Sequence, residues 1–333
     1  MIAYSYPGSN EFLVGTVGEV SPKTPKYPVL YNFVMTPFDK SNSETIWFKF
    51  SSISSSRVFD SPSNFNKKAS ESTSRSEYQQ SFDSIKNSIK SKQLEKVVLS
   101  RRLVTPRSKE DLYGLYISLK NKYPEAFTYL VSTPETGTWL GASPELVLSE
   151  NKGKVKTTAI AGTQPLNSSI EDIRWGAKEI QEHAYIESYL TEVLTANNIK
   201  FNISDKTTIP AGGVCHIYSM IDIIGNTDLI QLSNLIHPGP ALSGYPVKES
   251  INLISQLEET SRQFYCGMIG PINSSRIDWF ANIRCLQVHP DAYTLYVGGG
   301  ITADSDFESE WEETNLKAST LLSILETATV YDN

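Results

Sequence analysis

Cysteine is scarce in this sequence of 333 residues, which contains only three. Cys215, Cys266 and Cys285 form no Cys-x-x-Cys pair and show no metal-ligand spacing. An odd, sparse set of cysteines argues against a disulfide framework and favours buried thiols in a reducing compartment. The sequence therefore predicts neither a disulfide scaffold nor a cysteine metal site.

Long apolar runs and basic clusters are also missing. No apolar run approaches the roughly 18 residues that a helix needs to span a bilayer, and residues 1–7 lack the charged and apolar regions of a signal peptide. The net charge of −7, without a stripe of Lys and Arg, argues against nucleic-acid binding. We therefore expect a cytoplasmic protein with no membrane and no nucleic-acid partner.

The composition that remains is that of an ordinary globular protein, with 39% hydrophobic and 20% charged residues. Residues 1–60 contain short β-type runs, and residues 51–76 are rich in Ser and Asn. Such a polar stretch buries too little apolar surface to order itself, which predicts a mobile connector. We expect residues 1–76 to form an N-terminal, β-rich part of the same domain as residues 77–330.

From residue 77 onward, strand-like runs alternate with helical periodicities, which predicts one α+β domain with packed sheets and peripheral helices. The predicted helices cover residues 77–91, 110–123, 169–197, 229–235 and 247–257 and about five turns near the C-terminus. The predicted strands cover residues 95–104, 126–132, 138–142, 145–150, 154–160, 203–209, 215–225, 267–271, 276–289 and 292–301.

A glycine-rich stretch near the C-terminus carries a candidate ligand site. Gly298, Gly299 and Gly300 precede a predicted helix in which Glu310, Glu313 and Lys317 occupy positions i, i+3 and i+7 and so share one face. Two carboxylates and an ammonium beside glycines suggest a metal or anion site. Acidic residues also favour the first turn of any helix, and on spacing alone this simpler interpretation is preferred.

Two residues are candidates for acid–base chemistry. Lys96 opens an apolar strand, where a lysine usually extends its ammonium to solvent. If Lys96 is buried instead, its pKa falls and it becomes a plausible general base. Pro144 interrupts a strand and directs Glu145 away from regular sheet geometry, which makes Glu145 a candidate acid. General acid–base catalysis needs two such groups on either side of a reacting centre.

Further candidates come from a helix and a turn. Glu179, Glu182 and His183 form a Glu-x-x-Glu-His pattern that could bind a metal or form a polar helix face, and a carboxylate site would favour Mg²⁺ over zinc. Gly162 and Thr163 follow a strand and would admit a ligand or only make a turn. The residues alone therefore indicate an α+β enzyme, magnesium-dependent, that acts on an anionic small molecule.

Two common active-site motifs are absent. The glycines at 298–300 lack the Lys-Ser/Thr that follows a phosphate-binding loop, so a nucleotide site is not expected. Ser143 lacks the second glycine of a nucleophile elbow, so it is not expected to be a nucleophile.

Taken together, seven motifs between residues 77 and 327 resemble those of the chorismate-utilising enzymes. This family includes isochorismate synthases, salicylate synthases and the large subunits of anthranilate and aminodeoxychorismate synthases. The resemblance implies an α+β domain with two large, packed, mostly antiparallel β-sheets and helices outside. In order, the motifs are Lys96–Arg101, Gly141–Glu145, Ile160–Thr163, Glu182-His183, Ile283–Cys285, Gly298–Ile301 and Glu310–Thr314 with Lys317.

The chain looks closest to isochorismate synthases, and the resemblance implies roles for its residues. Lys96 would activate water for attack on C2 of chorismate, and Glu145 would protonate the departing C4 hydroxyl. Glu182 and Glu313 would hold Mg²⁺, with Glu310 supporting the metal directly or through water. The substrate carboxylates would be held by Arg284, Lys317 and backbone groups of Gly162, Thr163 and Gly298.

The loop after His237-Pro238 bears on the product. Aminating relatives usually carry threonine where this chain has Ala241, so Ala241 favours a water-derived product. We also expect a monomer, with no glutamine amidotransferase subunit. That product would serve menaquinone or siderophore biosynthesis. The alternatives are a salicylate synthase, an anthranilate or aminodeoxychorismate synthase large subunit, and a catalytically silent chorismate-binding relative. His237 and His183 are expected to order their surroundings instead of reacting.

Overall fold

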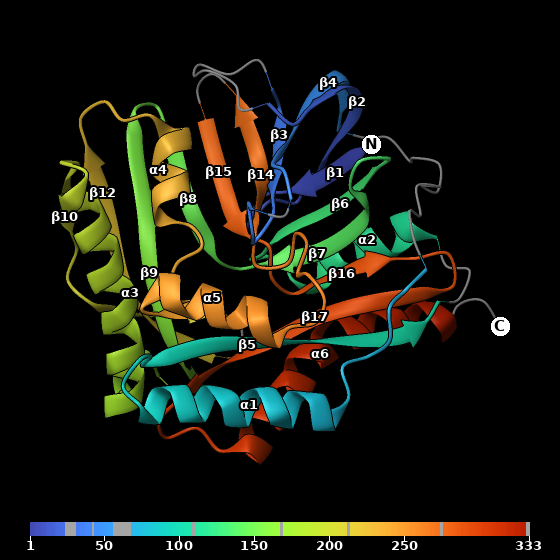
Figure 1. The fold of residues 1–333 in the computed structure, drawn as a ribbon. Coiled ribbons are helices and arrows are strands. Elements are labelled where there is room, and N and C mark those ends of the chain that lie inside the picture. Colours follow the sequence, from blue (N-terminus) through green and yellow to red (C-terminus); the bar gives the residue numbers. More distant parts are fainter. Residues whose placement is uncertain are drawn as a thin grey trace.

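The fold is an assembly of β-strands with helices on the outside (Figure 1). The computed structural model describes residues 1–23, 31–41, 43–55, 68–107, 111–166, 169–211, 214–273 and 276–330. The helices in these ranges are α1 (Arg75–Lys90), α2 (Leu112–Lys122), α3 (Ala177–Ala196), α4 (Leu229–Ile236), α5 (Val247–Leu257) and α6 (Phe307–Val330). The strands are β1 (Ile2–Ser5), β2 (Leu13–Ser21), β3 (Phe33–Thr36), β4 (Ile46–Ser54), β5 (Lys96–Pro106), β6 (Phe127–Thr133), β7 (Gly137–Ser143), β8 (Leu146–Asn151), β9 (Lys154–Pro165), β10 (Lys200–Ile203), β11 (Thr207–Ala211), β12 (Val214–Ile224), β13 (Gly244–Tyr245), β14 (Met268–Asn273), β15 (Arg276–Ala281), β16 (Cys285–Val288) and β17 (Ala292–Thr302).

All pairings between the described strands are antiparallel, and they join the strands into one network. One half runs β13–β5–β17–β16–β7–β6–β1. The other half runs β2–β4–β3–β14–β15–β8–β9–β12, and β10 and β11 both pair with β12. The β1–β2 pairing connects the two halves. The predicted α+β class with a mostly antiparallel sheet and peripheral helices is therefore confirmed.

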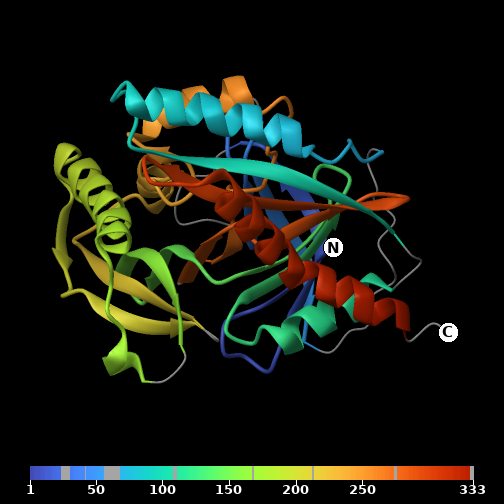
Figure 2. The same cartoon turned by 90° about the horizontal axis from the view of Figure 1, so that it is seen from below.

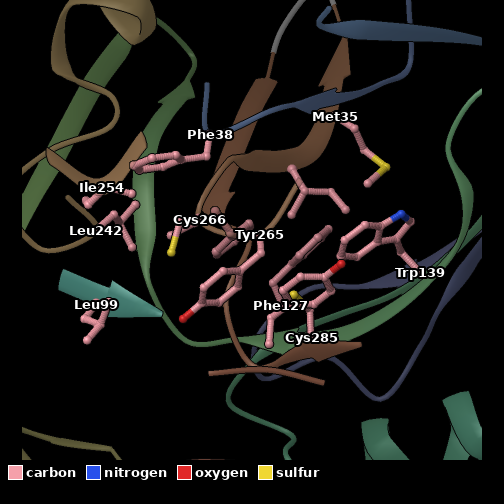
Figure 3. Close-up of a cluster of buried hydrophobic side chains, with 14 of the residues drawn as sticks. Met35, Phe38, Leu99, Phe127, Trp139, Leu242, Ile254, Tyr265, Cys266 and Cys285 are labelled. Carbon is pink, nitrogen blue, oxygen red and sulfur yellow. The ribbon is translucent and has the colours of Figure 1, made fainter. Parts of the chain in front are cut away.

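A large apolar core lies between the two halves (Figure 3). It contains Val97 and Phe127 from the first half and Phe33 and Phe280 from the second. The rings of Phe127 and Phe280 stack with centroids 4.4 Å apart and planes within 4° of parallel. The halves are therefore packed layers, although their backbones form one hydrogen-bonded network.

Helices cover the outer faces of both layers (Figures 1 and 2). Leu115 of α2 and Leu321 of α6 pack in one apolar cluster with strands of the first half. Leu190 of α3 and Leu232 of α4 pack in another cluster with strands of the second half. The helix α1 lies along β5 and contributes Ile85 to the central core. Within the described residues, no helix is both long and apolar enough to cross a membrane.

Several element boundaries differ from the predictions. Ser51–Ser54 belongs to β4 instead of a connector, because its residues pair with β2; residues 56–67 of that predicted connector lie outside the described residues. The long helix predicted over 169–197 begins only at Ala177, since Gly176 occupies its N-cap position after a short 3₁₀ turn. The strand predicted over 203–209 is divided into β10 and β11. The division of the chain at residue 76 stays a prediction.

The prediction of buried thiols is confirmed. Cys215, Cys266 and Cys285 are free and buried, and Cys266 and Cys285 lie in the central core. They act as small apolar fillers there.

The stacked phenylalanine pair predicts a stability effect. Phe280→Ala removes a buried ring from the interface between the layers, so we expect the free energy of unfolding to fall by about 3–5 kcal/mol. Urea denaturation followed by circular dichroism measures this change. The exposed Ile53→Ala, in β4, is the control and should change stability by less than about 0.5 kcal/mol. A cost for Phe280→Ala equal to that of the control would contradict the packing of the two layers.

Candidate active site

Lys96 lies at the start of β5 and is buried, with 6% of its surface exposed. It pairs with Tyr245 of β13 on one side and with Thr302 of β17 on the other. Its side chain lies over Gly300, where an added Cβ would be 2.6 Å from the Lys96 Cε and 3.3 Å from the Nζ. Lys96 is therefore buried, and the absence of a side chain at Gly300 leaves room for it. Its role as a base stays a prediction.

Glu145 lies between β7 and β8, just after Pro144. Its backbone carbonyl accepts a hydrogen bond from the Ala281 amide (2.9 Å), which fixes this bend against β15. Burial raises the pKa of Glu145 to about 7, although the positive charges of Lys96 and Arg284 act to lower it. The three side chains are thus close enough to interact. At neutral pH a large fraction of Glu145 carries a proton, as a general acid requires.

Arg284 lies in the short link between β15 and β16, where the prediction had one continuous strand over 276–289. Its φ is 48°, which is uncommon for a residue with a side chain and breaks the strand. The Arg284 carbonyl accepts from the Ala142 amide (3.1 Å). Burial lowers the pKa of Arg284, while the charge of Glu145 acts in the opposite direction. Arg284, which the resemblance predicts to bind a substrate carboxylate, thus has an uncommon backbone conformation.

Gly162 and Thr163 stand at the end of β9, close to α3. Gly162 has a φ of +69°, and an added Cβ would lie 2.9 Å from the Cβ of Glu179. The Gly162 carbonyl contacts His216 Nδ1 (2.8 Å), and the Thr163 hydroxyl lies 3.3 Å from the same nitrogen. Burial lowers the pKa of His216, and the charge of Arg284 lowers it further. Gly162 and Thr163 thus belong to a strand and not to the turn considered from the sequence, and His216, which contacts both, lies within electrostatic reach of Arg284.

Sequence reasoning missed His216. It lies in β12, where the pairing with β9 shifts register between Cys215 and Ile217. A bulge of this kind redirects a side chain. The sequence around His216 contains no motif that could have indicated its direction.

Glu310 is almost fully buried at the start of α6, with 4% of its surface exposed. The Ser305 hydroxyl donates to its Oε1 (2.6 Å), and an added Cβ on Gly299 would lie 2.8 Å from its Oε2. Successive residues of a strand face opposite sides. Lys96 approaches Gly300 and Glu310 approaches Gly299, so these two side chains lie against opposite faces of β17.

Glu313 and Lys317 lie further along α6 and are each about half exposed. Their ion pair spans 2.7 Å, and Lys317 Nζ also donates to the Gly298 carbonyl (2.8 Å). Burial raises the pKa of Glu310, the Ser305 hydrogen bond lowers it, and the Glu313 carboxylate raises it again. The structure therefore brings Glu310, Glu313 and Lys317 of α6 together beside Gly298 and Gly299 of β17.

Glu182 projects from α3, one helical turn after Lys178 and on the same face. The charge of Lys178 lowers the pKa of Glu310, so this end of α3 lies near α6. Within the described part of the chain, no group of three His, Cys, Asp or Glu side chains is arranged to hold a metal ion. The metal role of Glu182, Glu310 and Glu313 stays a prediction.

The donor set nevertheless fits Mg²⁺. The Glu310 Oε2 is buried and has no hydrogen-bond partner among the described residues. Its carboxylate and that of Glu313 repel each other, which a divalent cation would relieve. Carboxylate oxygens are the protein ligands that Mg²⁺ prefers.

The remaining candidates, Ala241, His237 and His183, make contacts within the fold. Ala241 is half-buried and packs against both the central core and the core under α3. Burial and the charge of Lys40 lower the pKa of His237 to about 3, so this histidine is neutral. His183 contacts the Ala159 carbonyl (3.2 Å) and the Ser219 hydroxyl (2.9 Å). These contacts attach α3 to β9 and β12.

A comparison with known families identifies the class of protein. The family of chorismate binding enzymes matches residues 36–323, which is most of the chain. The chain belongs to this family.

Individual relatives carry related names. The chain is similar to isochorismate synthase EntC of Escherichia coli K12, with 29% identity over 246 residues, 70% of this chain and 62% of that protein. It is also similar to the putative isochorismate synthase MenF of Mycobacterium tuberculosis H37Rv, with 32% identity over 260 residues, 70% of this chain and 68% of that protein. The chain thus spans less than two thirds of the length of EntC.

Solved structures support the same fold. The structure of the putative 2,3-dihydroxybenzoate-specific isochorismate synthase DhbC from Bacillus anthracis matches with a TM-score of 0.79 and 23% identity. The match covers 98% of this chain and 96% of that one. At this identity the likeness establishes the fold.

The protonation of Glu145 is directly measurable. Its pKa of about 7 lies above the unfolded value of 4.5, so the folded state binds the proton more tightly. This contribution to stability is present below pH 4.5 and is lost as the pH rises to about 7. We expect Glu145→Gln to raise the free energy of unfolding at pH 8 by about 3 kcal/mol relative to its effect at pH 4. Denaturant titrations at both pH values measure this, and an equal effect at both would contradict the raised pKa.

Proposed function

We propose that this protein converts chorismate to isochorismate in a magnesium-dependent reaction. The observation that carries the proposal is that Glu145, whose pKa is about 7, lies within electrostatic reach of the buried Lys96 and of Arg284. Such a group offers a proton acceptor, a proton donor and a fixed cation in one place. The family membership and the isochorismate synthases among the relatives support the same reaction.

The proposed reaction exchanges one hydroxyl group for another. Lys96 accepts a proton from water as the water oxygen bonds to C2 of chorismate. The ring double bonds shift, the bond between C4 and its hydroxyl breaks, and Glu145 donates a proton to the departing oxygen. One water enters and one leaves, so substrate and product are isomers.

The remaining residues bind the substrate. Arg284 lies within electrostatic reach of Glu145 and would hold a substrate carboxylate there. Lys317, attached to the Gly298 carbonyl, would hold the other, together with backbone groups of Gly162 and Thr163. Glu182 and Glu313 would hold Mg²⁺, supported by Glu310, and the ion would neutralise the substrate's carboxylate. Ala241 favours water over ammonia as the nucleophile, so no amidotransferase subunit is expected.

Product analysis tests the proposal. We expect the purified protein to form isochorismate from chorismate only when Mg²⁺ is present. In ¹⁸O-labelled water the product should carry one labelled oxygen, because the new hydroxyl comes from solvent. Liquid chromatography with mass spectrometry measures both results. Salicylate with pyruvate, an ammonia-dependent amino product, or chorismate binding without turnover would each contradict the proposal.

Substitution of Lys96 tests the assigned base. We expect Lys96→Ala to lower kcat by about 10²–10⁴-fold, because the water loses its proton acceptor. The exposed Lys92→Ala, four residues earlier, is the matched control and should keep the wild-type rate. Steady-state kinetics at saturating Mg²⁺ give the comparison. A rate for Lys96→Ala within about threefold of wild type would remove Lys96 as the base.

A further inference from the structure

Two buried oxygen atoms near Gly299 of β17 have no hydrogen-bond partner among the described residues. They are the Tyr78 hydroxyl on α1 and Glu310 Oε2 on α6. A Cβ added to Gly299 would lie 2.8 Å from the Glu310 oxygen and 4.0 Å from the Tyr78 oxygen. The two atoms therefore face the same small space beside β17.

The two atoms are chemically complementary. A tyrosine hydroxyl donates a hydrogen bond, and a carboxylate oxygen accepts one. Burial raises the pKa of Tyr78, and the charge of Glu310 raises it further, so the hydroxyl keeps its proton. A buried polar atom without a partner costs about 1–3 kcal/mol, and two such atoms facing one space are stabilised most simply by one water bonded to both.

The surrounding contacts hold both side chains in place. A capping box between Ser74 and Glu77 fixes the start of α1, just before Tyr78. The Tyr78 ring packs against Trp311 with centroids 5.5 Å apart and against Phe307 at 6.3 Å, on either side of Glu310 along α6. These ring contacts position Tyr78 without using its hydroxyl, so the hydroxyl is available to donate a hydrogen bond.

Glu310 is in turn connected to the strand that faces Lys96. Its Oε1 accepts from the Ser305 hydroxyl (2.6 Å), whose oxygen accepts from the Thr302 amide (3.0 Å). Thr302 pairs with Lys96 in the register of β17 and β5. A hydrogen bond from Tyr78 would complete a network that joins α1, α6 and the end of β17.

We propose that Tyr78 is a positioning residue whose hydroxyl is joined to Glu310 Oε2 by hydrogen bonds through one buried water. With one oxygen held by Ser305 and the other by Tyr78 through this water, the Glu310 carboxylate is fixed in orientation. The first turns of α6 are then fixed too, and Glu313 follows Glu310 by one turn. The part that concerns Mg²⁺ rests on the proposed function, whereas the hydrogen bond itself does not.

A double-mutant cycle in the metal-free protein tests the hydrogen bond. Tyr78→Phe keeps the ring and removes only the hydroxyl, and Glu310→Ala removes the acceptor. We expect the effects of the two substitutions on the unfolding equilibrium constant to be non-additive by about tenfold. If Glu310→Ala does not fold, Glu310→Met, which also lacks the acceptor oxygens but keeps most of the volume, replaces it in the cycle. Additive effects would overturn the hydrogen bond, whatever reaction the protein catalyses.

Titration of Mg²⁺ into the metal-free protein tests the positioning role. We expect Tyr78→Phe to raise the Kd for Mg²⁺, measured by calorimetry, at least about fivefold. Tyr116→Phe, which removes the hydroxyl of a buried tyrosine in the core under α2, is the control and should leave the Kd unchanged. A coupled cycle with an unchanged Kd would overturn the positioning role. Mg²⁺ binding too weak to measure in wild type would overturn it as well, together with the metal in the proposed function.

Discussion

The structure depends on three consecutive residues without side chains in β17. Gly298, Gly299 and Gly300 pair with Ser100, Leu99 and Val98 of β5. A Cβ at these positions would lie 2.9 Å from the Leu99 carbonyl, 2.8 Å from Glu310 Oε2 and 2.6 Å from Lys96 Cε, respectively. A side chain at Gly298 would therefore clash with the backbone of β5, and one at Gly299 or Gly300 would force Glu310 or Lys96 to shift.

The two faces of this strand carry different chemistry. On one face the buried Lys96 lies within electrostatic reach of Glu145, and so does Arg284. Burial raises the pKa of Glu145 and lowers that of Arg284, and the opposite charges of these two groups act against both shifts. On the other face Glu310 accepts a hydrogen bond from the Ser305 hydroxyl, and Trp311, the next residue of α6, packs against the Tyr78 ring of α1. The backbone of β17 therefore lies between Lys96 on one face and Glu310, in the first turn of α6, on the other.

Much of the fold could be predicted because the signals are local. Periodicity placed α1 over 77–91, and the structure has it at Arg75–Lys90, where the Ser74 cap begins it. Boundaries failed where distant contacts decide them. The extension of β4 to Ser54 depends on its pairing with β2, and the break at Arg284 depends on a positive φ that no nearby glycine or proline announces.

The sequence by itself determined most helices and strands, the family motifs and most candidate residues, because each of these depends on residues close together in the chain. Only the tertiary structure decided which of them meet. It buried Lys96 and set it near Glu145, brought in His216 through a bulge, and separated Glu310 from Lys96 by one strand. Burial and proximity arise from segments far apart in the chain, and these two quantities set the protonation states on which the chemistry depends.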